Sequence, residues 1–68
     1  MTEYQYRVDY STEAEDGCYG LISAFYDDEY SAETCAVRLL GTETRSGHLV
    51  TASKVFSPEG KLLNEFEV

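Results

Sequence analysis

The sequence predicts an α+β fold with the order β-β-α-β-β, in which a four-stranded, mainly antiparallel sheet carries one helix packed on one face. Four segments have the alternation, or the β-branched and aromatic content, that is typical of strands. One segment, residues 31–40, repeats apolar residues at the helical period. The chain has 68 residues, so residues 1–68 are expected to form a single domain.

The first strand is predicted over residues 4–10. Tyr4, Tyr6, Val8 and Tyr10 alternate with polar residues there, so they share one face, as in a half-buried strand. Residues 11–17 are polar and acidic and contain Asp16-Gly17, which predicts a loop.

The second strand is predicted over residues 18–26, whose sequence is CYGLISAFY. This segment is apolar on both faces, which favours a central strand with sheet neighbours on both edges. Gly20 within it indicates a bulge or a close approach of another part of the backbone. The alternative is a helix that begins near Glu13, which Gly17 and Gly20 would each weaken by roughly 1 kcal/mol.

The helix is expected to follow Ser31, whose hydroxyl suits an N-cap position. Its apolar stripe consists of Ala32, Cys35, Ala36, Leu39 and Leu40. Glu33 in the first turn and Arg38 near the end both suit the helix dipole. Gly41 lies where a left-handed residue commonly ends a helix. The small residues at 32, 35 and 36 would let the helix lie close to the sheet.

The third strand is predicted over residues 48–56, after a polar connection at residues 42–47. Val50, Ala52 and Phe56 are expected on one face of it. Residues 57–60 predict a turn, with Pro58 at the first central position and Gly60 in the left-handed position that follows.

The fourth strand is predicted over residues 61–68. The alternation of its apolar side chains places Leu62, Phe66 and Val68 on one face and Leu63 on the other.

The net charge of −8 lies entirely in the first half of the chain. Residues 1–33 carry nine acids and one base, whereas residues 34–68 carry four acids and four bases. Such an asymmetry predicts a one-signed field that attracts a basic partner and opposes direct binding to nucleic acid or to a membrane.

Two acidic clusters are the candidate contact sites in this half. The first comprises Glu13, Glu15 and Asp16, and the second comprises Asp27, Asp28 and Glu29, directly before the helix. The helix dipole gives the second cluster a structural reason, whereas the first has none in the sequence. If residues 18–26 form a strand, the two clusters lie at its opposite ends. A solubilising role is the alternative for both clusters.

Tyrosines accompany these acids. Tyr19, Tyr26 and Tyr30 flank the two clusters, and tyrosine suits an interface because it offers a large rigid surface with a polar tip. The predicted partner-binding set is Glu13, Glu15, Asp16, Tyr19, Tyr26, Asp27, Asp28, Glu29 and Tyr30.

No catalytic, cofactor or metal site is predicted. Phosphate-binding, zinc-protease and serine-hydrolase motifs are absent, and His48 alone is not expected to be catalytic. Cys18 and Cys35 are expected to be free, buried thiols, and with His48 they are too few for a zinc site. The N-terminal sequence has no signal-peptide pattern and no apolar run reaches membrane-span length, so a cytoplasmic protein is expected.

Small size, acidity, the lack of catalytic motifs and an α+β body together resemble small phage-encoded inhibitors. Among these are anti-CRISPR proteins, DNA-mimic anti-restriction proteins and inhibitors of host RNA polymerase. The resemblance is one of overall profile over the whole chain. It implies a non-catalytic inhibitor in the host cytoplasm that blocks a basic nucleic-acid-binding surface of a defence or transcription complex. The alternative is a structural or accessory module, as a monomer or a homodimer.

Overall fold

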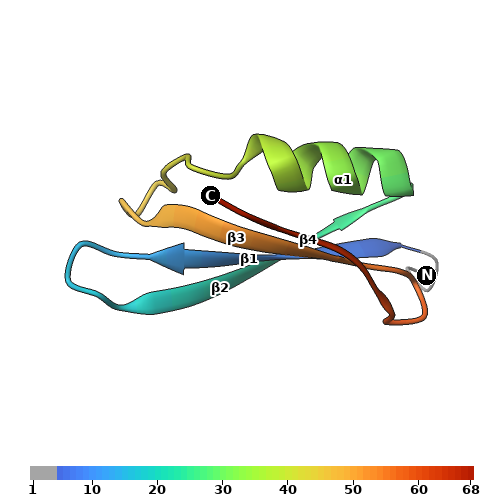
Figure 1. Cartoon of the computed structure of the whole chain (residues 1–68), viewed down its shortest axis with the longest axis horizontal. Coiled ribbons are helices and arrows are strands. Elements are labelled where there is room, and N and C mark those ends of the chain that lie inside the picture. Colours follow the sequence, from blue (N-terminus) through green and yellow to red (C-terminus); the bar gives the residue numbers. More distant parts are fainter. Residues whose placement is uncertain (1–4) are drawn as a thin grey trace.

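The computed structural model describes residues 5–68 and has the predicted order β-β-α-β-β. The elements are β1 (Tyr6–Glu13), β2 (Tyr19–Tyr26), α1 (Glu29–Arg38), β3 (Leu49–Phe56) and β4 (Leu62–Glu67). The four strands form one antiparallel sheet in the order β2-β1-β3-β4. The helix lies along one face of this sheet, and the opposite face is open (Figure 1). The predicted fold class is therefore confirmed.

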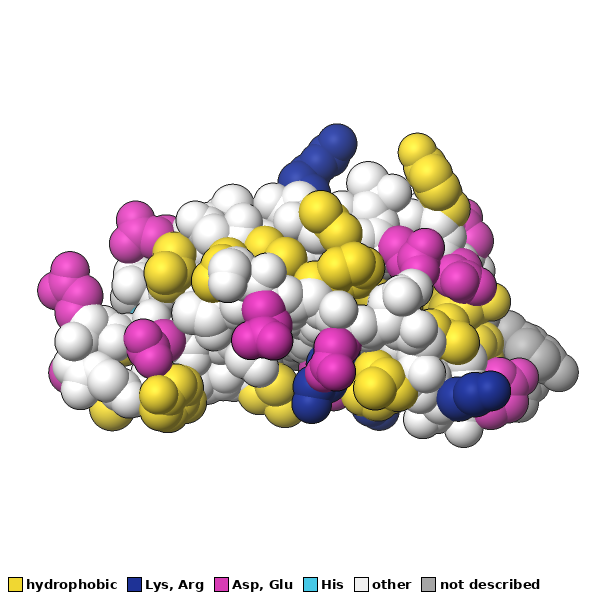
Figure 2. All heavy atoms as spheres, viewed as in Figure 1, with side chains coloured by type: hydrophobic (Ala, Val, Ile, Leu, Met, Phe, Trp, Pro, Cys, Tyr) yellow, Lys and Arg dark blue, Asp and Glu magenta, His cyan; other side chains and the backbone are white. Residues whose placement is uncertain are grey.

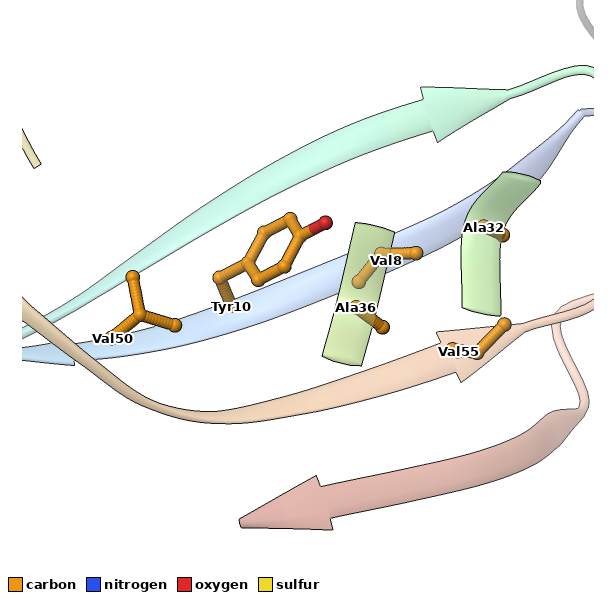
Figure 3. Close-up of a cluster of buried hydrophobic side chains, with 6 residues drawn as sticks. All are labelled: Val8, Tyr10, Ala32, Ala36, Val50 and Val55. Atoms are coloured by element: carbon orange, nitrogen blue, oxygen red, sulfur yellow. The ribbon is translucent and has the colours of Figure 1, made fainter. Parts of the chain in front are cut away.

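The core lies between α1 and the two central strands. It consists of Val8, Tyr10, Ala32, Ala36, Val50 and Val55. In Figure 3 the two alanines of α1 lie near Val8 of β1 and Val55 of β3, and Val50 lies at the other end of the cluster, beyond Tyr10. The predicted small residues do bring the helix close, since Ala32 and Ala36 are completely buried and Ser53 Oγ donates to the Ala36 carbonyl oxygen at 3.0 Å. Tyr4, predicted on the same strand face, lies outside the described residues.

The helix begins three residues earlier than predicted. Asp28, and not Ser31, is the N-cap, and its Oδ1 accepts a hydrogen bond of 2.6 Å from the Ser31 backbone N–H. Both residue types suit this position, so the sequence alone does not choose between them. The helix ends at Arg38, and Gly41 has the expected positive φ of 79°.

The first strand continues further than predicted. Residues 11–13 belong to β1, not to a loop, because the alternation extends to Thr12, which is buried on the helix face. The close approach expected at Gly20 is made by a side chain and not by the backbone, and no bulge occurs there. Gly20 lies opposite Thr12 in the register, and a Cβ atom there would come within 2.8 Å of Thr12 Oγ1.

The prediction of a central position for β2 is wrong. This strand lies at an edge and pairs with β1 alone among the described residues. Its apolar residues on both faces are mostly exposed and not covered by sheet neighbours. Cys18, expected to be buried, is exposed just before this strand, and Cys35 is half-buried; both are free thiols.

Register shifts change the faces of β3 and β4. Between Ser11 and Thr12 the pairing with β3 skips Thr51, so Val50 faces the helix while Ala52 and Phe56 lie on the open face. A second shift skips Leu63 in β4. Leu63 and Phe66 both pack against the core, and Leu62 is exposed. The predicted faces are therefore wrong for Val50 and Leu62, because each bulge reverses the alternation beyond it, whereas Ala52 and Phe56 do share a face.

The turn that joins β3 and β4 forms as predicted. Gly60 has a φ of 91°, and the Ser57 backbone N–H donates to the Lys61 carbonyl oxygen at 2.8 Å. A left-handed residue at this position is what glycine allows without steric cost.

Candidate functional site

The two acidic clusters lie at opposite ends of β2, as the sequence predicted. The turn cluster (Glu13, Glu15 and Asp16) precedes this strand, and the helix cluster (Asp27, Asp28 and Glu29) follows it. Eight residues of strand separate them, which is roughly 25 Å at about 3.3 Å per residue. In Figure 2 acidic side chains are visible at both ends of the molecule's long axis. The two clusters therefore remain separate in the folded chain.

One acid in each cluster has a structural role. Asp16 Oδ1 accepts a hydrogen bond of 3.0 Å from the Cys18 backbone N–H, which closes the β1–β2 turn. That bond lowers the pKa of Asp16, and the nearby His48 adds to the effect. The capping bond from Ser31 likewise lowers the pKa of Asp28. The expectation that the turn cluster has no structural reason is thus wrong for Asp16.

We expect the stabilising effect of the Asp28 charge to depend on pH. Because the pKa of Asp28 is lowered in the folded chain, its charge contributes stability above its ordinary value of 3.8, and that contribution is lost as the pH falls through the folded-state pKa. The variant Asp28→Asn keeps a capping oxygen but removes the charge. Wild type should melt at a higher temperature than this variant at neutral pH, and the difference should shrink as the pH falls below 3.8 and close once it is below the folded-state pKa.

Thermal melts followed by circular dichroism at neutral and strongly acidic pH measure this difference. Glu59→Gln, which removes one charge from the exposed β3–β4 turn, is the control for net charge. An Asp28→Asn deficit of the same size at both pH values would contradict the charge-based explanation.

The other acids of the two clusters are free to contact a partner. Within residues 5–68, no hydrogen bond or ion pair engages the side chains of Glu13, Glu15 and Glu29. Asp27 accepts a bond of 3.2 Å from Gln5 Nε2 at an exposed position. Glu15, Asp27 and Glu29 are exposed, and Glu13 is half-exposed. Charge left unpaired at the surface is available to a basic partner.

The three predicted contact tyrosines have different environments. Tyr19, on the open face at the start of β2, and Tyr30, in the first turn of α1, are both about four-fifths exposed. Tyr26 instead packs against the core, and its hydroxyl shares a hydrogen bond of 2.9 Å with that of Tyr10. Burial raises the pKa of both phenols. Tyr26 therefore supports the fold, whereas Tyr19 and Tyr30 are exposed aromatic side chains beside the two clusters.

An open hollow lies beside the turn cluster. It has a volume of about 440 Å³ and is formed between the β1–β2 turn and the loop before β3. Glu15, Asp16, Glu43 and His48 line it. The position of His48 beside this hollow could not be predicted from local sequence, because the pairing of Glu13 with Leu49 is what brings the two loops together. The hollow adds Glu43 to the acids at this end.

Exposed apolar side chains on β2 were missed by the sequence prediction. Leu21 is 65% exposed, Phe25 58% and Ile22 46%. The signal that could have revealed this surface is the apolar run of residues 18–26, which was interpreted as a central strand. At an edge of the sheet the same apolar side chains are exposed. Leu21 and Phe25 share the open face, Ile22 lies on the helix face, and exposed apolar side chains along one element are a common feature of interaction surfaces in soluble proteins.

The centre of the open face, by contrast, is occupied by contacts within the chain. Arg7 lies over the Phe56 ring, with Cζ 4.4 Å from the centroid. Arg7 Nε is 3.1 Å from Asp9 Oδ1, an ion-pair distance without the geometry of a hydrogen bond. Ser23 Oγ donates to Asp9 Oδ1 at 2.8 Å. On the β2 side of this face, Tyr19, Leu21 and Phe25 stay exposed beside these contacts.

Residues 5–68 contain no group of three or more metal-ligating side chains placed to hold an ion. In the same described part of the chain, no helix has the length and apolar character to cross a membrane. Comparison with known proteins gives no match to a family model, to a curated protein or to a solved structure.

Proposed function

We propose that this chain is a non-catalytic protein-binding module that inhibits a basic, nucleic-acid-binding protein by covering the surface that holds the nucleic acid. The observation that carries the proposal is the pair of acidic clusters at the two ends of β2, whose Glu13, Glu15 and Glu29 have no structural partner among residues 5–68. Unpaired negative charge at the surface speeds the encounter with a basic partner and disfavours binding to an anionic one.

The spacing of the clusters supports a partner with an extended basic surface. Roughly 25 Å of strand separates them, so a point-like ligand cannot reach both. A groove that holds a nucleic-acid backbone is lined by Lys and Arg over such a distance. Tyr19 and Tyr30 add aromatic faces beside each cluster, on which Arg and Lys side chains pack well.

Charge reversal at free acids tests the proposal without harm to the fold. The variant Glu13→Lys with Glu15→Lys spares Asp16 and Asp28, which hold a turn and a helix start. Tagged protein is mixed with nuclease-treated bacterial lysate, and recovered nucleic-acid-binding proteins are quantified by mass spectrometry. The reversal should lower their recovery about tenfold, which corresponds to about 1.4 kcal/mol of binding.

A matched control changes the same amount of charge elsewhere. Glu59→Lys with Glu67→Lys places the reversal in the β3–β4 turn and at the end of β4, the edge strand across the sheet from β2. This control should keep its recovery. If both double variants lose recovery equally, or neither does, the clusters are solubilising and the proposal fails.

A further inference from the structure

The edge formed by β2 is open to pairing with another strand. Within the described residues β2 has one sheet neighbour, and its eight residues contain no charge and no proline. Its register with β1 runs over eight pairs without a shift. Natural edge strands are usually blocked by charges, prolines or bulges. The other edge strand, β4, has such protection, since it carries Glu65 and Glu67 and a register shift at Leu63.

The side chains of β2 also suit an added strand. Leu21 and Phe25 are exposed on the open face, and Ile22, whose position in the register is on the helix face, is exposed as well. Apolar surface therefore follows this strand on both sides of the sheet. A strand added to an edge places alternate side chains on the two faces, so an incoming strand would meet apolar contacts on each.

The charge at the two ends of β2 selects the occupant. A strand that pairs along its full length places its own ends beside the turn cluster and the helix cluster. In a symmetric antiparallel pairing of two copies, the turn cluster of one copy would lie beside the helix cluster of the other, which sets acid against acid at both ends. A segment with Lys or Arg at each end instead meets opposite charge at both.

We propose that the β2 edge accepts an extended segment of the partner, which has an alternating apolar centre about as long as β2 and basic residues at both ends. The segment adds a fifth strand to the sheet through main-chain hydrogen bonds. This inference rests on the proposed function, because it assumes a basic protein partner, and it specifies where and in what conformation that partner binds.

The probe for this edge is a synthetic peptide. It alternates Val and Thr over eight residues, to match the length of β2, and carries two lysines at each end. Binding is followed by nuclear magnetic resonance with isotope-labelled protein. We expect shift changes and slowed amide exchange in β2, with β4 unaffected. The same peptide with glutamates at both ends, and one with methylated backbone nitrogens, should not bind.

Two protein variants test whether the peptide binds at the β2 edge or anywhere on the open face of the sheet. Leu21→Lys places a blocking charge on β2, and Leu62→Lys places the same charge on the exposed part of β4 at the opposite edge. Leu21→Lys should weaken peptide binding at least about tenfold, whereas Leu62→Lys should change it less than about twofold. Both side chains are exposed, so both variants should keep the wild-type melting temperature.

Four outcomes would overturn the inference. Equal weakening by the two variants would indicate binding to the open face, and equal binding of the glutamate peptide would remove the charge argument. A wild-type dimer in light scattering that Leu21→Lys dissociates would make a second copy the occupant. If no peptide perturbs β2 while lysate recovery still depends on Glu13 and Glu15, the edge inference fails and the proposed function stands.

Discussion

Replacing Tyr10 with alanine is expected to remove about 3–5 kcal/mol of folding free energy, the range found when a large buried aromatic is truncated. Tyr10 is 3% exposed, lies at the centre of the core and shares a hydrogen bond with Tyr26. A domain of 68 residues has a total stability of roughly 3–10 kcal/mol, so this one change should remove between about a third and the whole of it.

Urea unfolding followed by circular dichroism measures the loss. Tyr30→Ala is the matched control, because Tyr30 is an exposed tyrosine on α1, and its truncation should cost less than about 0.5 kcal/mol. Tyr10→Phe keeps the ring and removes the hydroxyl, so it should cost about 1 kcal/mol. Equal stability of Tyr10→Ala and Tyr30→Ala would mean that the core does not lie where the structure places it.

Local pattern was sufficient to predict the order of the elements. The alternation of Tyr6, Val8 and Tyr10 marks β1, and Ala32 and Ala36 at helical spacing mark the buried side of α1. These signals act within one element, where the side-chain period alone decides which residues share a face.

Position within the sheet could not be predicted in the same way. The segment CYGLISAFY is apolar on both faces, which usually means that sheet neighbours and helices cover it, yet β2 lies at an edge. Edge or centre is a property of the whole sheet and depends on which strands pair. The same holds for the bulges at Thr51 and Leu63, which reverse the faces of β3 and β4 and leave no clear mark in the local sequence.

The sequence predicted the exposed acidic residues of the candidate site, but it did not predict the exposed apolar residues of β2. Glu13, Glu15, Asp27 and Glu29 are available at the surface as expected, since charged residues are seldom buried. Leu21 and Phe25 were not among the predicted contact residues, because β2 was predicted to be a central strand. β2, whose position was predicted wrongly, is therefore also the strand that joins the two acidic clusters. The wrong position of β2 in the sheet explains why its exposed apolar side chains were left out of the predicted site.

Enlarging Ala36 to leucine is expected to cost about 1–3 kcal/mol, because the added carbons have no room between α1 and the sheet. Ala36 is completely buried over β1 and β3 (Figure 3), and its carbonyl oxygen accepts the bond from Ser53 Oγ. A leucine at this position must push the helix outward, which breaks that bond. Val37→Leu, at the exposed next position, should cost less than about 0.5 kcal/mol.

A double-mutant cycle separates this displacement of the helix from a simple local clash. In wild type, Ser53→Ala should cost about 1 kcal/mol through the lost hydrogen bond to the Ala36 carbonyl. In the Ala36→Leu background the bond is already broken, so the same change should cost close to nothing. If Ser53→Ala costs as much in the Ala36→Leu background as in wild type, the distance between α1 and β3 is unchanged. The leucine is then accommodated by movement of neighbouring side chains alone.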